Sequence, residues 1–208
     1  MADIDAFLDD LSSAAPVPGG GTVAALETAM AASLLAMVCN LTLGKKRYAA
    51  VEPRIRTALQ EAGELRDRAR QLGGEDVEAY GAVARVLALP RVTEEEKATR
   101  AVRLQDALKG AAVPPLETMQ LASQVLYLAG DLVDIGNSSA ISDIGTAAAS
   151  ARAGFEAARL NVEINLAGIK DQEWALETRR AMDEIPAPEL LEQTIMQKVT
   201  SIIRGNIA

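Results

Sequence analysis

The sequence contains no histidine, a single cysteine and few aromatic residues. Without histidine, a Ser-His-Asp triad and the usual histidine-ligated metal sites are excluded, so acid–base chemistry must use Asp, Glu, Lys, Tyr or Cys. The single cysteine, Cys39, excludes an internal disulfide, and because it stands in an apolar run we expect a small buried side chain. Aromatic residues make up 3% of the chain, and runs rich in Val, Ile, Tyr and Phe that would indicate strands are missing.

The chain is instead rich in small apolar residues, which make a helical protein the expected class. Apolar residues form 49% of the 208 residues, and many of them are alanine, which lets helices approach closely. The net charge of -8 argues against nucleic acid as a partner, because binding phosphates requires clustered cations. The acidic segment MADIDAFLDD does not resemble a signal peptide, so we expect a cytoplasmic protein.

Hydrophobic spacing and capping signals predict an all-α protein, an antiparallel up-and-down bundle of seven to eight helices in a single domain, residues 1–208. The residues following the third helix, from Gly73, either continue it or start another. Pro114 and Pro115 are expected to begin the fifth helix. The predicted helices cover residues 3–14, 22–43, 53 onwards, 93–112, 114–135, a long segment to about 170, 171–184 and a last segment ending near 207.

The predicted helix 22–43 contains only one charged residue, Glu27. Its length is compatible with a membrane span. Its hydrophobicity is weak, however, and it contains Thr, Ser and Asn, which favours a buried central helix, at a dimer interface, and no membrane partner.

The segment PVPGGGTVAAL places Gly19, Gly20 and Gly21 immediately before a predicted helix that Thr22 could cap. It formally fits a dinucleotide-binding pattern, but no strand precedes it and no acidic residue follows about twenty positions later. It is not a phosphate-binding loop either, because no Gly-Lys-Ser/Thr follows. Two interpretations remain: backbone N–H groups open to an anion or a carbonyl, or a tight helix crossing that admits no Cβ.

Two charged motifs follow. GKKRY places Lys45, Lys46 and Arg47 after a helix C-terminus, where they either complement the helix dipole or bind an anionic ligand. EDVEAY contains Asp76, which either belongs to an exposed acidic face or points inward among apolar neighbours. An inward carboxylate would have a raised pKa and could act as a base.

Two polar motifs lie further along. GNSSAISD holds Asn137, Ser142 and Asp143 at a break between helices, where Ser142 or Asp143 could serve as a helix cap. Asn161 and Asn165 stand four residues apart on an otherwise apolar helix, so their amides need partners. They either bond within the bundle or recognise a ring that has donors and acceptors.

Five motifs in this order resemble the cyclodeaminase/cyclohydrolase family, from about Phe7 to Asp171. They are PVPGGGTVAAL, GKKRY, EDVEAY, GNSSAISD and LNVEINLAGIKD. The family comprises methenyltetrahydrofolate cyclohydrolases and the cyclodeaminase part of formiminotransferase-cyclodeaminase. The resemblance implies a dimeric helical fold that binds folate in a cleft near the subunit contact, with no metal and no cofactor.

The resemblance also implies roles for individual residues. Asp76 would be the catalytic base and then acid, Lys45 would stabilise negative charge on oxygen, and Asp143 would orient the substrate or a partner side chain. A purely structural role for Asp143, as the cap of its helix, is the alternative. The residues expected to bind or shape the site for substrate are Gly19, Gly20, Gly21, Lys46, Asn137, Ser142, Asn161 and Asn165.

Three functions are compatible with this resemblance. The first is hydrolysis of 5,10-methenyltetrahydrofolate to 10-formyltetrahydrofolate, whose electrophilic amidinium carbon requires only an oriented and deprotonated water. The second is the ammonia-releasing cyclodeaminase reaction on formiminotetrahydrofolate. The third, of a different class, is a helical dimer that binds folate without turnover.

Overall fold

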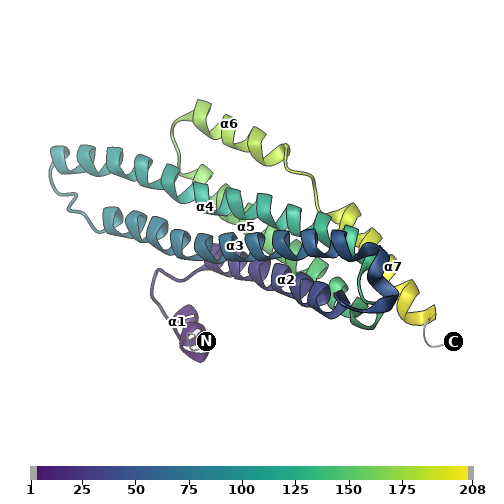
Figure 1. The fold of residues 1–208 in the computed structure, drawn as a ribbon. Coiled ribbons are helices and arrows are strands. Elements are labelled where there is room, and N and C mark those ends of the chain that lie inside the picture. The colour runs from purple at the N-terminus through teal and green to yellow at the C-terminus, as the bar shows by residue number, and fades with distance from the viewer. Residues whose placement is uncertain (1–3, 206–208) are drawn as a thin grey trace.

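The computed structural model describes residues 4–205, and over this range the chain forms seven α-helices, two short 3-10 helices and no strand (Figure 1). The prediction of an all-α bundle is therefore confirmed. The α-helices are α1 Ile4–Ser12, α2 Gly20–Thr42, α3 Glu52–Leu87, α4 Glu94–Ile135, α5 Ile141–Ala167, α6 Gln172–Asp183 and α7 Glu189–Gly205, and the 3-10 helices are η1 Lys46–Val51 and η2 Ser138–Ala140.

The long helices α2, α3, α4 and α5 make an antiparallel up-and-down bundle (Figure 1). Each packs against the next in the chain, and α5 closes the bundle against α2. Fully buried side chains such as Leu35, Leu126 and Ile144 fill its centre. α7 packs on α4 and α5, whereas α1 has no buried residue and lies to the side of the bundle.

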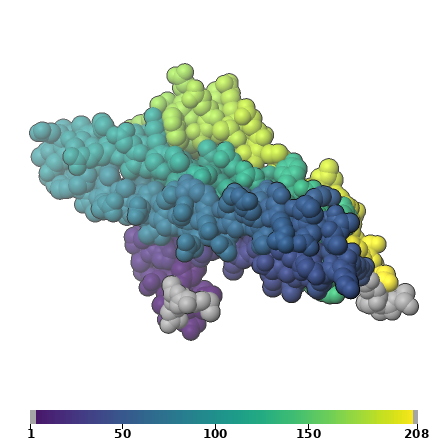
Figure 2. Space-filling view, in the orientation of Figure 1, coloured from purple at the N-terminus to yellow at the C-terminus, as the bar shows by residue number. Residues whose placement is uncertain are grey.

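The helices α3 and α4 are much longer than the other two and project past the start of α2 and the end of α5 as a helical hairpin (Figures 1 and 2). They contain 36 and 42 residues, compared with 23 in α2 and 27 in α5. α4 begins at Thr93 with the predicted capping box, in which Thr93 and Glu96 bond each other's backbone N–H groups. The hairpin leaves a recess where α2 begins, and that recess contains the candidate site.

The expected helix boundary at Pro114 is wrong, because α4 continues through Pro114 and Pro115 without a break. A proline inside a helix has no N–H and leaves a carbonyl one turn earlier without its helical partner. For Pro115 that carbonyl belongs to Ala111, and it accepts a hydrogen bond from Nδ2 of Asn165 at 3.0 Å instead. A side chain of α5 thus replaces the missing backbone donor of α4.

Two other helix predictions are settled by the structure. α3 runs without interruption through Gly73 and Gly74, so the segment EDVEAY continues this helix. α2 starts at Gly20 and not at Thr22, with Gly19 as the residue before it. At its other end Gly44 has a φ of 72°, the left-handed conformation expected of a glycine that ends a helix.

α2 is a core helix of the bundle. It is long and apolar enough to cross a membrane, but 61% of its most apolar stretch is buried by the other helices. Cys39 lies in this buried face, where burial raises the pKa of its thiol to about 11, so the prediction of a small buried side chain is confirmed. Gly154 of α5 permits the close crossing with α2, because a Cβ there would lie 2.9 Å from the carbonyl oxygen of Ala24.

Candidate functional site

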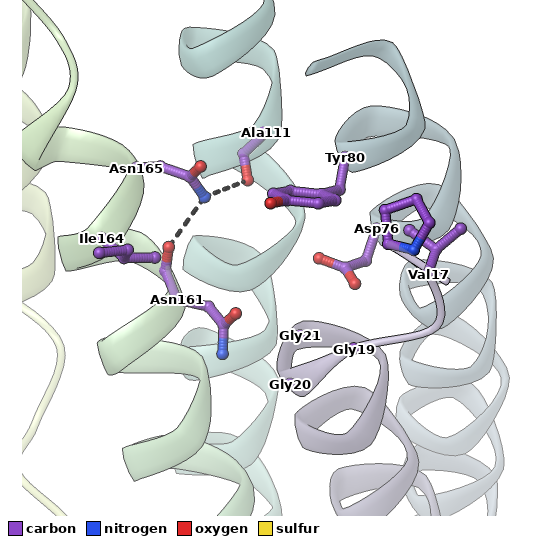
Figure 3. A pocket seen from close by; sticks show the side chains of 11 residues that line it. Val17, Gly19, Gly20, Gly21, Asp76, Tyr80, Ala111, Asn161, Ile164 and Asn165 are labelled. Atoms are coloured by element: carbon purple, nitrogen blue, oxygen red, sulfur yellow. Dashed lines mark hydrogen bonds between the residues drawn. The ribbon is translucent and has the colours of Figure 1, made fainter. Parts of the chain in front are cut away.

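The recess at the end of the bundle is a pocket of about 290 Å³ (Figure 3). Its walls come from the segment before α2, the start of α2, the middle of α3, and facing turns of α4 and α5. Its lining residues are Pro16, Val17, Gly19, Gly20, Gly21, Asp76, Tyr80, Ala111, Asn161, Ile164 and Asn165. The structure therefore brings together the glycine turn, the inward carboxylate and the asparagine pair. Two hydrogen bonds between the walls each join residues that stand 54 positions apart in the chain.

Asp76 is the only carboxylate that lines this pocket, within the described part of the chain. Its Oδ2 accepts a hydrogen bond from Oγ1 of Thr22 at 2.9 Å. Burial raises the pKa of Asp76, and the hydrogen bonds from Thr22 lower it by less. A half-buried carboxylate that binds its proton more tightly than usual is suited to take a proton from water and return it.

The neighbouring acidic residue Glu75 does not share this environment. It forms an ion pair with Arg68, at 2.5 Å between Oε1 and Nη1, and Arg68 also pairs with Glu117 on α4. This network lies at the surface of α3 and α4. Of the two interpretations of EDVEAY, the exposed acidic face therefore describes Glu75 and the inward carboxylate describes Asp76.

The triple glycine allows α2 to begin against two side chains of the pocket. A Cβ on Gly21 would clash with Oδ1 of Asp76 and would lie 2.6 Å from its Cγ. A Cβ on Gly20 would lie 3.0 Å from Nδ2 of Asn161, whereas a Cβ on Gly19 would meet nothing within 4 Å. Both Gly20 and Gly21 are thus positions of close approach, and what they approach is the polar lining of a pocket.

Thr22 has a role that differs from the expected one. It lies inside the first turn of α2, and its hydroxyl group bonds Asp76 and does not cap the helix. The helix has no side-chain cap at its first residue. The hydroxyl group at this position therefore fixes the orientation of the carboxylate across the α2–α3 contact.

The asparagine pair is held by backbone carbonyl groups. Nδ2 of Asn161 donates to the oxygen of Ala157 at 2.8 Å, and Nδ2 of Asn165 donates to those of Asn161 and Ala111 (Figure 3). These bonds match the bundle-internal interpretation. They use only the nitrogens, however, and the two amide oxygens have no hydrogen bond to any described residue, which leaves two acceptors beside the pocket.

Tyr80 is a pocket residue for which the sequence motifs predict no role. It lies one turn after Asp76 on α3, is 40% exposed, and its ring stands beside the carboxylate at the pocket (Figure 3). Its spacing of four residues from Asp76 within EDVEAY was the available signal, since residues four apart share a helix face. Ile164, 70% exposed, adds an apolar edge opposite it.

The other predicted site residues lie at the opposite end of the bundle. Lys45 and Lys46 follow the C-terminus of α2, about 33 Å from its glycine turn for a helix of this length. Asn137, Ser142 and Asp143 lie near that end as well, around the start of α5. Within one chain the structure therefore separates these five residues from the pocket.

Asn137 has a clear structural role at this far end. Its Nδ2 donates to the oxygen of Leu41 at 2.8 Å, and its Oδ1 accepts from the N–H of Ser139 at 3.1 Å. Its amide therefore caps η2 and ties it to α2. The expectation that Ser142 or Asp143 caps the helix is wrong, because the residue before α5 is Ala140 and Asp143 lies in the first turn.

Comparison with known proteins identifies the family. The model of the formiminotransferase-cyclodeaminase family matches residues 3–184. The chain belongs to this family. A relative, the methenyltetrahydrofolate cyclohydrolase of Methylorubrum extorquens, is 41% identical over 94% of this chain and 97% of its own length.

Longer family members and a solved structure agree with this membership. The formimidoyltransferase-cyclodeaminase of Rattus norvegicus is 29% identical over 88% of this chain, which spans about a third of that relative. The crystal structure of formiminotetrahydrofolate cyclodeaminase from Thermotoga maritima superposes with a TM-score of 0.81 at 29% identity, covering 99% of this chain and 98% of that one. The resemblance inferred from five sequence motifs is therefore confirmed.

Proposed function

We propose that this member of the formiminotransferase-cyclodeaminase family hydrolyses 5,10-methenyltetrahydrofolate to 10-formyltetrahydrofolate. The observation that carries the proposal is the position of Asp76, a half-buried carboxylate with a raised pKa that faces the pocket beside an otherwise unused pair of amide oxygens. The 41% identity to a cyclohydrolase along its whole length supports the choice of reaction. The free thiol of Cys39 suits a protein that works in the reducing cytoplasm.

Asp76 would act twice in this reaction. Its carboxylate takes a proton from water as the water oxygen bonds to the amidinium carbon between the two folate nitrogens. The O–H of this adduct then loses its proton to solvent as the C=O bond forms and the C–N5 bond breaks, Asp76 returns its proton to N5, and the formyl group stays on N10. The cationic substrate and one water give the neutral product and one proton released to solvent, and no cofactor takes part.

The cyclodeaminase reaction is the second candidate, and the Thermotoga maritima structure favours it because the whole fold superposes. There a folate nitrogen attacks the formimino carbon and ammonia leaves, so the same base in the same pocket could serve. The two reactions differ in their substrate and product and not in the residues that the pocket requires.

An absorbance assay run beside an ammonia assay separates the two reactions. We expect purified protein to accelerate the decay of methenyltetrahydrofolate absorbance, in a buffer where spontaneous hydrolysis is slow, without releasing ammonia from formiminotetrahydrofolate. Ammonia release with slow decay would assign the chain to the cyclodeaminases. Binding of either folate without turnover would make it a folate-binding protein and would contradict both enzymatic proposals.

A homodimer would complete the site. α2 exposes Met30, Met37 and Leu41, and the adjacent α5 exposes Leu160 and Ile164, so large apolar side chains of both helices lie open to solvent. If two copies pack α2 against α2 in opposite directions about a two-fold axis, the end of one α2 lies beside the start of the other. Lys45 of the partner subunit would then approach the glycine turn and Asp76, and Lys46 of the partner subunit would follow.

Complementation between inactive variants tests this arrangement. We expect heterodimers of Asp76→Asn and Lys45→Ala chains, purified with two different tags, to recover about half of the wild-type activity, because one of the two sites contains neither change. Heterodimers of Asp76→Asn and Asn161→Ala chains are the matched control and should stay inactive, since each site contains one change. Equal activity in both mixtures would contradict a site shared between subunits.

A further inference from the structure

The projecting hairpin carries a second cavity, of about 250 Å³, beyond the pocket. Its lining contains four cations and three other residues, namely Arg91, Lys97, Arg100, Lys170, Ala101, Leu104 and Gln105. No carboxylate of the described residues lines it, although the chain as a whole has a net charge of -8. Such a concentration of positive charge creates a local potential that attracts anions.

Arg100 is the fixed element of this cavity. Its Nη2 donates to the carbonyl oxygen of Leu87 at the end of α3, at 3.1 Å, which holds the guanidinium in place. Its Nε is buried and has no hydrogen-bond partner within residues 4–205. A buried N–H without an acceptor is costly, and the guanidinium to which it belongs lines the cavity, where its other N–H groups can form charge-assisted bonds with a carboxylate.

Two of the other cations are also available to a ligand. Arg91 and Lys170 are exposed and form no ion pair with a described residue. Lys97 pairs with the exposed Glu94 at 2.7 Å, a contact of small energetic value. The nearby carboxylate of Glu96 is occupied by the N–H groups of Val92 and Thr93.

The cavity lies in line with the pocket. Along α4, Arg100 and the pocket residue Ala111 share a helix face and stand three turns, or about 16 Å, apart. Leu104 lies on the same helix between them and lines the cavity. On the neighbouring element, Lys170 follows the pocket residue Asn165 just beyond the end of α5. Figure 2 shows this hairpin projecting beyond the rest of the molecule.

We infer that this cationic cavity binds the glutamate carboxylates of the folate substrate. A tetrahydrofolate is elongated, with the pterin at one end, an aminobenzoyl group in the middle and one or more glutamates at the other end. With its reacting end at Asp76, such a molecule can extend along the hairpin until its carboxylates reach Arg91, Arg100 and Lys170. The inference rests on the proposed function, and it makes the number of glutamates a determinant of affinity.

Kinetics with substrates of different tail length test the inference. The substrates are the methenyl derivatives of tetrahydropteroate, which lacks glutamate, of tetrahydrofolate with one glutamate, and of its triglutamate. For the Arg91→Gln/Lys170→Gln variant we expect KM for the triglutamate to rise about tenfold, KM for the pteroate compound to stay the same, and kcat to stay the same for both. For the wild type, high salt should reduce the difference in KM between the triglutamate and the pteroate compound.

A matched control variant and a binding measurement separate failure of this inference from failure of the proposed function. The Lys198→Gln/Arg204→Gln variant also removes one lysine and one arginine, but on α7, far from both cavities. It should leave every KM unchanged. If the Arg91→Gln/Lys170→Gln variant keeps the wild-type ratio of the triglutamate KM to the pteroate KM, the inference is wrong. A change of that ratio in Lys46→Gln instead would assign the binding of the glutamates to Lys46. If the wild type turns over no substrate, the proposed function fails, and dissociation constants for the same three compounds still test the tail site by the same ratio.

Discussion

Replacing Asp76 with asparagine is expected to lower kcat for methenyltetrahydrofolate hydrolysis by about 10²–10⁴-fold, the range that a general base contributes. Asparagine retains the shape and can still accept a hydrogen bond from the Thr22 hydroxyl group, so the pocket should keep its form. The affinity for the 10-formyl product should therefore change little. Steady-state absorbance kinetics together with a titration of the product measure the two effects separately.

The pH dependence distinguishes a catalytic base from a residue that only binds substrate. Because burial raises the pKa of Asp76, the wild-type rate should fall on the acid side at a higher pH than an ordinary carboxylate would produce. The Asp76→Asn variant should show a low rate without this acid limb. A variant that kept the wild-type rate, or kept the same acid limb, would contradict the role given to Asp76.

The same substitution should stabilise the fold at neutral pH. The pKa of Asp76 is higher in the folded than in the unfolded state. Its contribution to folding stability is therefore complete below the unfolded-state pKa and is lost as the pH rises through the folded-state pKa. Asparagine carries no charge to bury, and we expect a higher Tm for the variant than for the wild type at neutral pH. Thermal unfolding at low pH, where both side chains are neutral, should show no such difference.

Replacing Gly21 with alanine is the second substitution with a large expected effect. The added Cβ would clash with Oδ1 of Asp76 and would lie 2.6 Å from Cγ and 2.8 Å from Oδ2, so either the carboxylate or the start of α2 must move. A displacement of about 1 Å in a catalytic group can cost on the order of 10²-fold in rate. We expect a loss of about that size in kcat/KM, with a far-ultraviolet circular dichroism spectrum that remains helical.

The neighbouring glycines supply the controls. Gly19→Ala places its Cβ where no protein atom lies within 4 Å, in an extended backbone that any residue adopts, so Asp76 should stay in place and kcat should remain near that of the wild type. Gly20→Ala should be intermediate, because its Cβ would lie 3.0 Å from the amide nitrogen of Asn161, a side chain that can shift. Equal losses at all three positions would mean that the glycines serve helix entry and not the approach to Asp76.

Local patterns predicted most of the fold because the helices here begin and end with local signals. The Thr93 capping box, Gly44 after α2 and the apolar spacing within each helix all gave boundaries close to those observed. Pro114 and Pro115 gave the wrong boundary for a reason that lies far away in the chain. The carbonyl left without a partner is satisfied by Asn165 of α5, and no local rule could reveal that contact.

The candidate site was predictable in its parts and not in its assembly. The inward position of Asp76 followed from its apolar neighbours on α3, and the need of Asn161 and Asn165 for partners followed from their apolar helix. Which motifs meet depends on the length and direction of the helices between them. The 23 residues of α2 separate the glycine turn from Lys45, so five of the expected residues stand at the other end of the same bundle.

The bond between Asn165 and the carbonyl of Ala111 has a consequence for how this family can change over time. At Asp76 the demands of folding and of turnover oppose each other. A family member that no longer needs the reaction would therefore gain folding stability by losing the carboxylate. At Asn165 the two demands coincide, because the side chain that lines the pocket also donates the hydrogen bond that Pro115 cannot give to the carbonyl of Ala111. A descendant with altered chemistry would therefore be expected to exchange Asp76 early and to keep Asn165 for as long as it keeps the proline.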